Sequence, residues 1–160
     1  MVEQLILMHK QKLIDLISDH EGVKFKVYDD ATGQELKAGD ILIGHPTIGI
    51  GRNVAKDGLG ISQEEAEFML MNDIDRVKEE IKNFPILHLN EVRTAVIIDM
   101  AFNMGISRFN ANKFPKFFNA IANEDFKLAT KEMLDSNWAR QTKRRSAKLS
   151  QMMLLGNWTD

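Results

Sequence analysis

The stretch DHEGVKFKVYDD, residues 19–30, decides how the whole chain is interpreted. Before it, apolar residues recur at helical spacing over residues 5–20, which predicts a helix ending at Glu21. Gly22 fits the position just past a helix end, where a left-handed backbone costs little only for glycine. Apolar and polar residues then alternate as in a half-buried strand. The apolar residues of this strand are Val23, Phe25 and Val27.

Two carboxylates border this strand in unlike surroundings. Glu21 would lie at the negative end of a helix dipole, where an anion is disfavoured. The protonated form that a general acid requires is thereby favoured. Asp30 would lie in a polar turn, and two carboxylates in different environments form a candidate acid and base pair. A glutamate and a glycine at a helix end are also common without any catalytic role.

Composition narrows the class of protein. With 160 residues the chain can form one domain or two small lobes around a real core. It has no cysteine, which excludes disulfides and thiol chemistry, and its four histidines are scattered without metal-ligand spacing. No apolar run approaches the length of a membrane span, and the N-terminus resembles neither a secretory signal nor an anchor. We therefore expect a protein made and kept in the cytosol.

Charge is divided unevenly along the chain. The first 80 residues carry an acidic excess and the last 80 a basic excess, with a basic cluster between Arg140 and Lys148. Such asymmetry could favour an anionic polymer, or it could reflect two ordinary solvated surfaces. The cluster lacks interleaved aromatic residues and the protein is acidic overall, so nucleic-acid binding has little support.

The rest of the first half predicts a small sheet and a long helix. Short apolar and Gly-rich runs, including Ile41–Ile43, predict an antiparallel sheet of three or four strands. The helix predicted over residues 62–83 begins with Ser62 and Glu65 in the spacing of a capping box.

The second half predicts a set of helices around a buried one. Asn90 can cap the next helix, which is apolar on nearly every side, as is typical of a buried central helix. Gly105 fits the end of this helix. Trp138 and Trp158 are interpreted as core anchors. The remaining helical stretches are predicted at 107–112, 115–122, 124–135, 137–141 and 142–155, the last ended by Gly156.

Several groups of residues, in order along the whole chain, resemble the phage-type lysozymes, the T-even phage endolysin family (glycoside hydrolase family 24). The groups are His20-Glu21-Gly22 with Asp30, Thr47-Ile48-Gly49-Ile50-Gly51, Ala101-Phe102-Asn103-Met104-Gly105, Trp138-Ala139-Arg140-Gln141-Thr142 with Arg145, and residues 151–158. The resemblance implies an α+β, mostly helical, two-lobed fold. Residues 15–60 would form the sheet lobe, 62–83 the connecting helix, and 84–160 together with 1–14 the helical lobe.

The resemblance also implies an activity, the hydrolysis of the β-1,4 bond between N-acetylmuramic acid and N-acetylglucosamine in bacterial peptidoglycan, without a cofactor. Glu21 would be the general acid, Asp30 would assist the attacking water, and Thr47 would help to place it. The family is regarded as inverting, which requires the two carboxyl groups to lie roughly 6.5–9.5 Å apart.

Further roles follow from the same resemblance. Phe102 would border the cleft, Gln141 and Thr142 would lie near its wall, and Arg145 would pair with Glu21. The partners implied are peptidoglycan glycan strands, with no nucleic acid and no membrane anchor. The protein would act as a monomer that leaves the host cytoplasm through a pore made by a separate protein, reaches the cell wall in the periplasm and causes lysis.

The sequence departs from the family pattern at two places. Residues 31–46 form an insertion between Asp30 and Thr47, which would lengthen the sheet or form a flap, and which makes Asp40 a rival for the second carboxylate. Arg52 stands where the family usually has a histidine. Since that histidine pairs with an aspartate matching Asp73, we predict an Arg52–Asp73 ion pair.

Two other functions remain open at this point. A lytic transglycosylase would use Glu21 alone and release anhydro products. A non-catalytic peptidoglycan-binding component of a phage would keep the fold without the chemistry.

Overall fold

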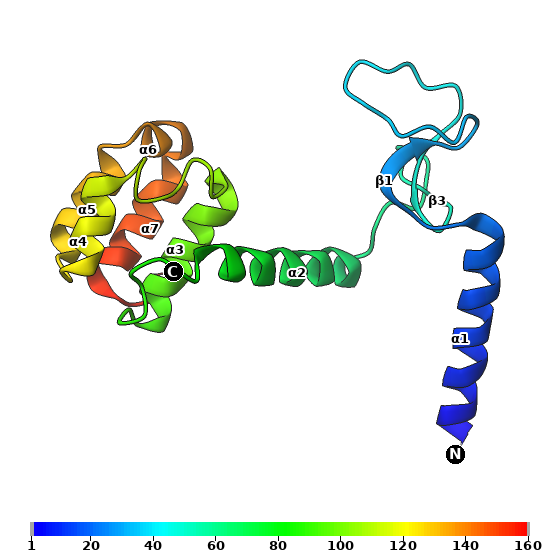
Figure 1. The fold of residues 1–160 in the computed structure, drawn as a ribbon, viewed down its shortest axis with the longest axis horizontal. Helices are drawn as coiled ribbons and strands as arrows, with labels where there is room; N and C mark the ends of the chain where they lie inside the picture. Colours follow the sequence, from blue (N-terminus) through cyan, green and yellow to red (C-terminus); the bar gives the residue numbers. More distant parts are fainter. Residues whose placement is uncertain (1, 160) are drawn as a thin grey trace. The chain divides into compact units, whose positions relative to one another are not determined.

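Helices and one small sheet follow each other in the predicted order in a computed structural model, which describes residues 2–159 and the side chains of residues 10–159 (Figure 1). The fold class, α+β and mostly helical, is confirmed. The elements are α1 (Val2–Glu21), β1 (Lys24–Asp29), β2 (Pro46–Gly49), β3 (Arg52–Asn53), α2 (Gln63–Ile81), α3 (Glu91–Met104), α4 (Pro115–Ala122), α5 (Phe126–Leu134), α6 (Asn137–Thr142) and α7 (Arg144–Leu155).

The chain divides into two compact units, which we call the N-terminal unit (residues 1–66) and the C-terminal unit (residues 67–160). The predicted assignment of residues 1–14 to the helical lobe stays a prediction. None of the helices within residues 2–159 is long and apolar enough to cross a membrane.

The end of α1 is as predicted. Gly22 has a φ of 70°, and its N–H donates to the carbonyl oxygen of Ser18 at 2.8 Å. Glycine is favoured there because a Cβ makes positive φ costly. Glu21 is thereby the last helical residue, and β1 begins three residues later at Lys24.

The sheet has three antiparallel strands in the order β1-β2-β3, within the predicted three or four. Tyr28 on β1 lies opposite Thr47 on β2, and Thr47 in turn lies opposite Asn53 on β3. The predicted half-burial of β1 is wrong for Phe25, which is 86% exposed, because the buried apolar cluster is formed by described residues of the C-terminal unit. The apolar run 41–43 forms no strand and lies in the long β1–β2 loop.

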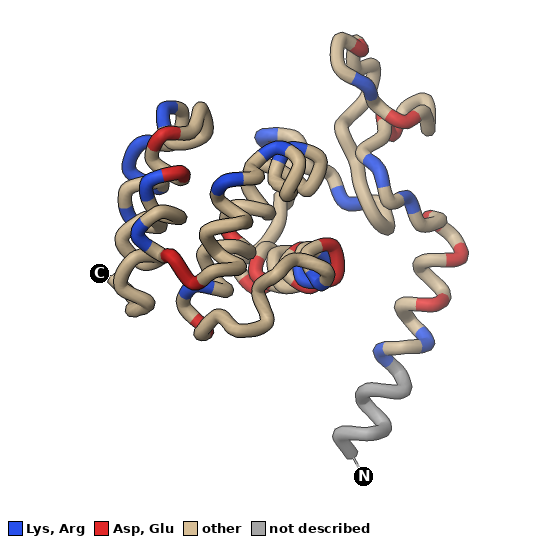
Figure 2. Tube along the Cα trace, turned by 60° about the vertical axis from the view of Figure 1, so that its left-hand side comes forward, with Lys and Arg blue, Asp and Glu red and all other residues tan. Residues whose placement is uncertain are grey.

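The start of α2 confirms the predicted capping box. The N–H of Glu65 donates to Oγ of Ser62 at 3.2 Å, and the N–H of Ser62 donates to Oε2 of Glu65 at 2.8 Å. Two otherwise unpaired donors at the helix start are thus satisfied reciprocally. Near its C-terminal end, α2 carries ion pairs between residues three or four positions apart, such as Arg76 with Glu80. Figure 2 shows that this helix carries both acidic and basic residues.

α3 is the buried central helix of the C-terminal unit, as predicted. Oδ1 of Asn90 accepts the N–H of Arg93 at 3.0 Å, and the helix ends before Gly105. α7 packs against both α3 and α5, and α4 packs against α5. The buried residues of α3 are Val92, Val96, Ile97, Met100 and Ala101.

The segment 107–112 is not the predicted helix. Its Phe109 is fully buried, with ring centroids of four neighbouring phenylalanines within 6.1 Å. The side chain of Asn110 replaces helical hydrogen bonds, since its amide donates to the carbonyl oxygen of Ile106 and its Oδ1 accepts the N–H of Lys113. The chain therefore turns around the buried phenylalanine instead of continuing as a helix.

The two tryptophans differ. Trp138 is buried and donates from Nε1 to Oδ1 of Asn103 at 2.8 Å, as a core anchor. Trp158 is 63% exposed, so its prediction as a core residue is wrong. The last helix begins at Arg144, because Lys143 has a φ of 37° and separates it from α6.

Candidate active site

Glu21 meets the turn between β2 and β3. Gly51 in that turn has a φ of 73°, and a Cβ built on it would lie 3.3 Å from Oε2 of Glu21. A glycine is therefore suited to this position both by its backbone conformation and by the close carboxylate. The exposed Glu21 carboxyl group lies beside backbone of the sheet and within reach of solvent.

Asp29, which the sequence analysis did not select, is the buried carboxylate of the N-terminal unit. Its Oδ1 accepts the N–H groups of Ala31 at 2.9 Å and Gly44 at 3.0 Å, and its Oδ2 accepts the N–H of Ile43 at 2.7 Å. The hydrogen bond from Ile43 is the main cause that holds the pKa of Asp29 below its ordinary value, against the opposing effect of burial. Asp29 thus ties the two ends of the β1–β2 loop together.

Asp30 is bound by the same loop through one residue, His45. The N–H of His45 donates to Oδ1 of Asp30 at 2.6 Å, and the ring Nδ1 of His45 lies 3.4 Å from Oδ2. The N–H of Asp30 in turn donates to the carbonyl oxygen of His45 at 3.1 Å. Asp30 is therefore positioned by the far end of the insertion.

Thr47 reaches the same carbonyl group. Its buried side chain donates from Oγ1 to the carbonyl oxygen of His45 at 3.2 Å. Because that oxygen also accepts the N–H of Asp30, two of the predicted site residues share one partner. The structure thus brings Asp30 and Thr47 together, although 16 residues separate them in the sequence.

Asp40, the rival carboxylate, is occupied in a turn of the insertion. Its Oδ2 accepts the N–H of Lys37 at 2.8 Å, and its own N–H donates to the carbonyl oxygen of Lys37 at 3.1 Å. Asp40 therefore has a structural role in this turn, which accounts for an aspartate at this position without a catalytic role.

Arg52 forms an ion pair with Glu65, and its predicted ion pair with Asp73 stays a prediction. The two guanidinium nitrogens of Arg52 lie 2.9 and 3.0 Å from the two carboxylate oxygens of Glu65, in the two-point geometry that suits an arginine. The capping box turns the carboxylate of Glu65 back toward the loop before α2, where Arg52 reaches it. Asp73 pairs with Arg76, three residues further along α2.

The other predicted site residues belong to the C-terminal unit. Nε of Arg145 donates to Oδ1 of Asp99 at 2.7 Å, and the predicted pairing of Arg145 with Glu21 stays a prediction. Thr142 donates from Oγ1 to the carbonyl oxygen of Trp138 at 2.9 Å. Phe102 at the end of α3 is 41% exposed.

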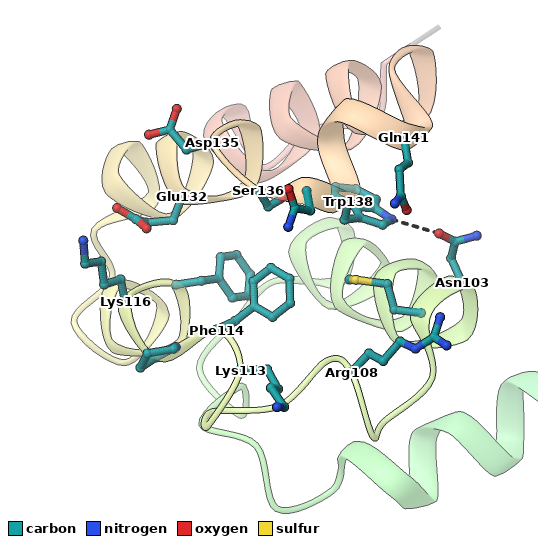
Figure 3. Close-up of a pocket in the computed structure, with 14 residues that line it drawn as sticks. Asn103, Arg108, Lys113, Phe114, Lys116, Glu132, Asp135, Ser136, Trp138 and Gln141 are labelled. Atoms are coloured by element: carbon teal, nitrogen blue, oxygen red, sulfur yellow. Dashed lines mark hydrogen bonds between the residues drawn. The ribbon is translucent and has the colours of Figure 1, made fainter.

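Gln141 lines a cavity of about 620 Å³ within the C-terminal unit. Figure 3 shows its amide beside the hydrogen bond between Trp138 and Asn103. The lining of the cavity combines aromatic side chains with charged groups of both signs. The charged residues are Arg108, Lys113, Lys116, Glu132 and Asp135. Among the described residues, no group of three or more His, Asp or Glu is placed to hold a metal ion.

Comparison with known proteins confirms the resemblance. The phage lysozyme family matches residues 18–151, and the chain belongs to this family. The chain is 26% identical over 162 residues to the pre-baseplate central spike protein Gp5 of Enterobacteria phage T4, a match that covers 91% of this chain but only 28% of the spike protein. It is also 26% identical over 160 residues to the probable T4-type lysozyme 1 of Dictyostelium discoideum, covering 89% of this chain and 93% of that protein.

Proposed function

We propose that this protein is a muramidase, a glycoside hydrolase that cleaves the β-1,4 bond between N-acetylmuramic acid and N-acetylglucosamine of bacterial peptidoglycan. Membership of the phage lysozyme family supports this reaction class. The observation that carries the residue roles is the shared contact of Asp30 and Thr47 with the carbonyl group of His45. This contact joins the predicted base to the predicted water-placing hydroxyl.

In the proposed mechanism, Glu21 donates its proton to the glycosidic oxygen as the bond from that oxygen to the anomeric carbon breaks. A water molecule attacks the anomeric carbon from the opposite face, and Asp30 accepts the proton that this water loses. The hydroxyl group of Thr47 gives its hydrogen to His45, so its oxygen lone pairs are available to accept a hydrogen bond from the water. The product sugar would have inverted anomeric configuration.

Asp30 is the better candidate for the base than Asp40. Asp30 lies at the end of β1, and its oxygens contact a residue that also contacts Thr47. Asp40 accepts a hydrogen bond within its own turn.

Substrate contacts in the C-terminal unit are proposed for Phe102, Gln141 and Thr142. The exposed ring of Phe102 offers an apolar surface for a sugar face, and the amide of Gln141 points into a cavity with further polar groups. The proposed biological role is lysis of a host bacterium by a monomer released from the cytoplasm to the periplasm through a pore made by another protein. Intact cells should then resist added enzyme, whereas permeabilised cells should lyse.

The experiment that tests this function compares wild type with Glu21→Gln in the clearing of purified peptidoglycan. The matched control is Glu91→Gln, the same change at an exposed position in the first turn of α3. Loss of the general acid should lower the rate by about 10²–10⁴-fold, while the control should clear at the wild-type rate. Mass analysis of the fragments should show reducing-end muramic acid.

Other outcomes would overturn the proposal. Anhydro-muramic acid products would identify a lytic transglycosylase. Equal binding to the wall without clearing by wild type would identify a peptidoglycan-binding component that has no hydrolase activity.

A further inference from the structure

The return arm of the insertion, residues 43–45, wraps two consecutive carboxylates. The N–H groups of Ile43 and Gly44 both donate to Asp29, and the N–H of His45 donates to Asp30. Three successive backbone N–H groups therefore donate hydrogen bonds to two successive carboxylates. Such a match between donors and acceptors fixes the position of the arm relative to the end of β1.

Gly44 is needed for this close approach. A Cβ built on Gly44 would lie 2.0 Å from Oδ1 of Asp30 and 2.8 Å from the Cβ of Ala31. Any side chain at this position would push the arm and the Asp30 carboxylate apart.

The ring of His45 completes the contact. Its Nδ1 lies 3.4 Å from Oδ2 of Asp30, the oxygen that the backbone of the arm leaves free. The carboxylate of Asp29 is turned to the amides of Ile43 and Gly44, and the ammonium group of Lys24 contacts the carbonyl oxygen of Gly33. His45 is therefore the basic side chain that pairs with Asp30.

We propose that the return arm is a positioning device for the catalytic base, in which His45 orients the Asp30 carboxylate and, through its own protonation, adjusts its strength as a base. The catalytic part of this inference rests on the proposed function. A protonated ring beside Oδ2 stabilises the carboxylate and weakens it as a base, whereas a neutral ring in contact with Oδ2 restricts its orientation without that penalty. Since the side chains of His45 and Asp30 are 54% and 42% exposed, water screens the pair and a moderate effect is expected.

The first test measures kcat and KM of three variants on peptidoglycan fragments between pH 4 and 8. His45→Ala should lower kcat about tenfold at constant KM, because a misplaced base affects the chemical step. His45→Gln, which keeps a hydrogen-bond donor but cannot titrate, should recover much of kcat and lose the step in the pH profile that His45 protonation causes. Ile41→Ser, at an exposed position in the same loop, is the control and should match wild type.

Two results of this kinetic test would contradict the proposed role of His45. A rise in KM with unchanged kcat would make His45 a substrate contact, and unchanged pH profiles in both histidine variants would remove its role in adjusting the base. Either result would overturn the inference. The proposed function would still stand as long as the wild-type enzyme clears peptidoglycan.

A second test does not depend on activity. In wild type, the carboxyl carbon resonance of Asp30, followed by NMR during a pH titration, should report both its own protonation and that of His45. The second step should disappear in His45→Gln, and Gly44→Ala should shift the Asp30 resonance at all pH values. Identical titration curves in wild type and both variants would show that the arm does not position Asp30, whatever the enzyme hydrolyses.

Discussion

The N-terminal unit and the C-terminal unit are stabilised by different kinds of contact. Among the side chains that the structure describes, every buried apolar residue lies between Val77 and Met153, in the C-terminal unit. The described residues that are buried in the N-terminal unit are Asp29 and Thr47, and both are polar. The proposed base, Asp30, is thus positioned by hydrogen bonds, and the proposed acid, Glu21, by the glycine turn at the end of α1, whereas the helices of the other unit pack around an apolar core.

This difference has a consequence for mutation and pH. Removal of apolar volume should damage the C-terminal unit severely and the N-terminal unit little. Protonation or substitution of the Asp29 carboxylate should instead affect the N-terminal unit and leave the C-terminal unit unchanged. The reason is that the β1–β2 loop depends on Asp29 for three of its hydrogen bonds.

The largest effect on stability is expected from Phe109→Ala. Truncation of this fully buried ring should lower the free energy of unfolding of the C-terminal unit by about 3–5 kcal/mol, since it leaves a cavity among four other rings. Phe25→Ala is the matched control at an 86% exposed position, and it should change the free energy of unfolding by less than about 0.5 kcal/mol. Urea unfolding followed by the fluorescence of Trp138 and Trp158 measures both, and equal losses would show that the contrast between the units is wrong.

An intermediate effect is expected from Glu65→Ala. This change removes one half of the capping box and both contacts with Arg52, and should cost about 1 kcal/mol. Glu79→Ala removes only an exposed pair with Lys82 and serves as the control. If amide exchange at the start of α2 is unchanged in Glu65→Ala, the capping box contributes nothing measurable.

The smallest effect, confined to the β1–β2 loop, is expected on acidification. The pKa of Asp29 in the folded protein lies below its ordinary value of 3.8. The ionised Asp29 therefore contributes stability to the folded state that is fully present above pH 3.8 and is lost as pH falls through the folded pKa. Between these two pKa values the unfolded state binds more protons than the folded state, so acidification favours unfolding. The amide proton shifts of Ile43 and Gly44 should move in this acidic range.

The same shifts should lack that pH dependence in Asp29→Asn and keep it in Asp57→Asn, an exposed change in the loop before α2. A transition of the Ile43 and Gly44 amides that persists in Asp29→Asn would assign the effect to another group.

Local signals predicted much of this fold. Gly22, the capping box of Ser62, Asn90 and the glycine after α7 each mark a helix boundary that the structure has. Such signals can be found in the sequence because a helix cap is made by residues within three or four positions of the helix end.

The contacts that were not predicted join residues far apart in the sequence or depend on the direction in which a side chain is turned by a local hydrogen bond. Asp29 accepts N–H groups from 14 and 15 residues away, and the donors are backbone groups that any residue type would supply. The contact of Arg52 with Glu65 was not predicted, because it depends on the direction in which the capping box turns the Glu65 carboxylate. For Trp158, apolar character alone could not indicate that the ring stays exposed.

The central claim is that the N-terminal unit carries the proposed acid, Glu21, and holds the proposed base, Asp30, by hydrogen bonds from the β1–β2 loop. The most direct measurement compares kcat of Asp30→Asn and Asp40→Asn on the same peptidoglycan fragments. The account predicts a loss of about 10²-fold or more for Asp30→Asn and a rate within about threefold of wild type for Asp40→Asn. A large loss for Asp40→Asn together with an active Asp30→Asn enzyme would contradict it.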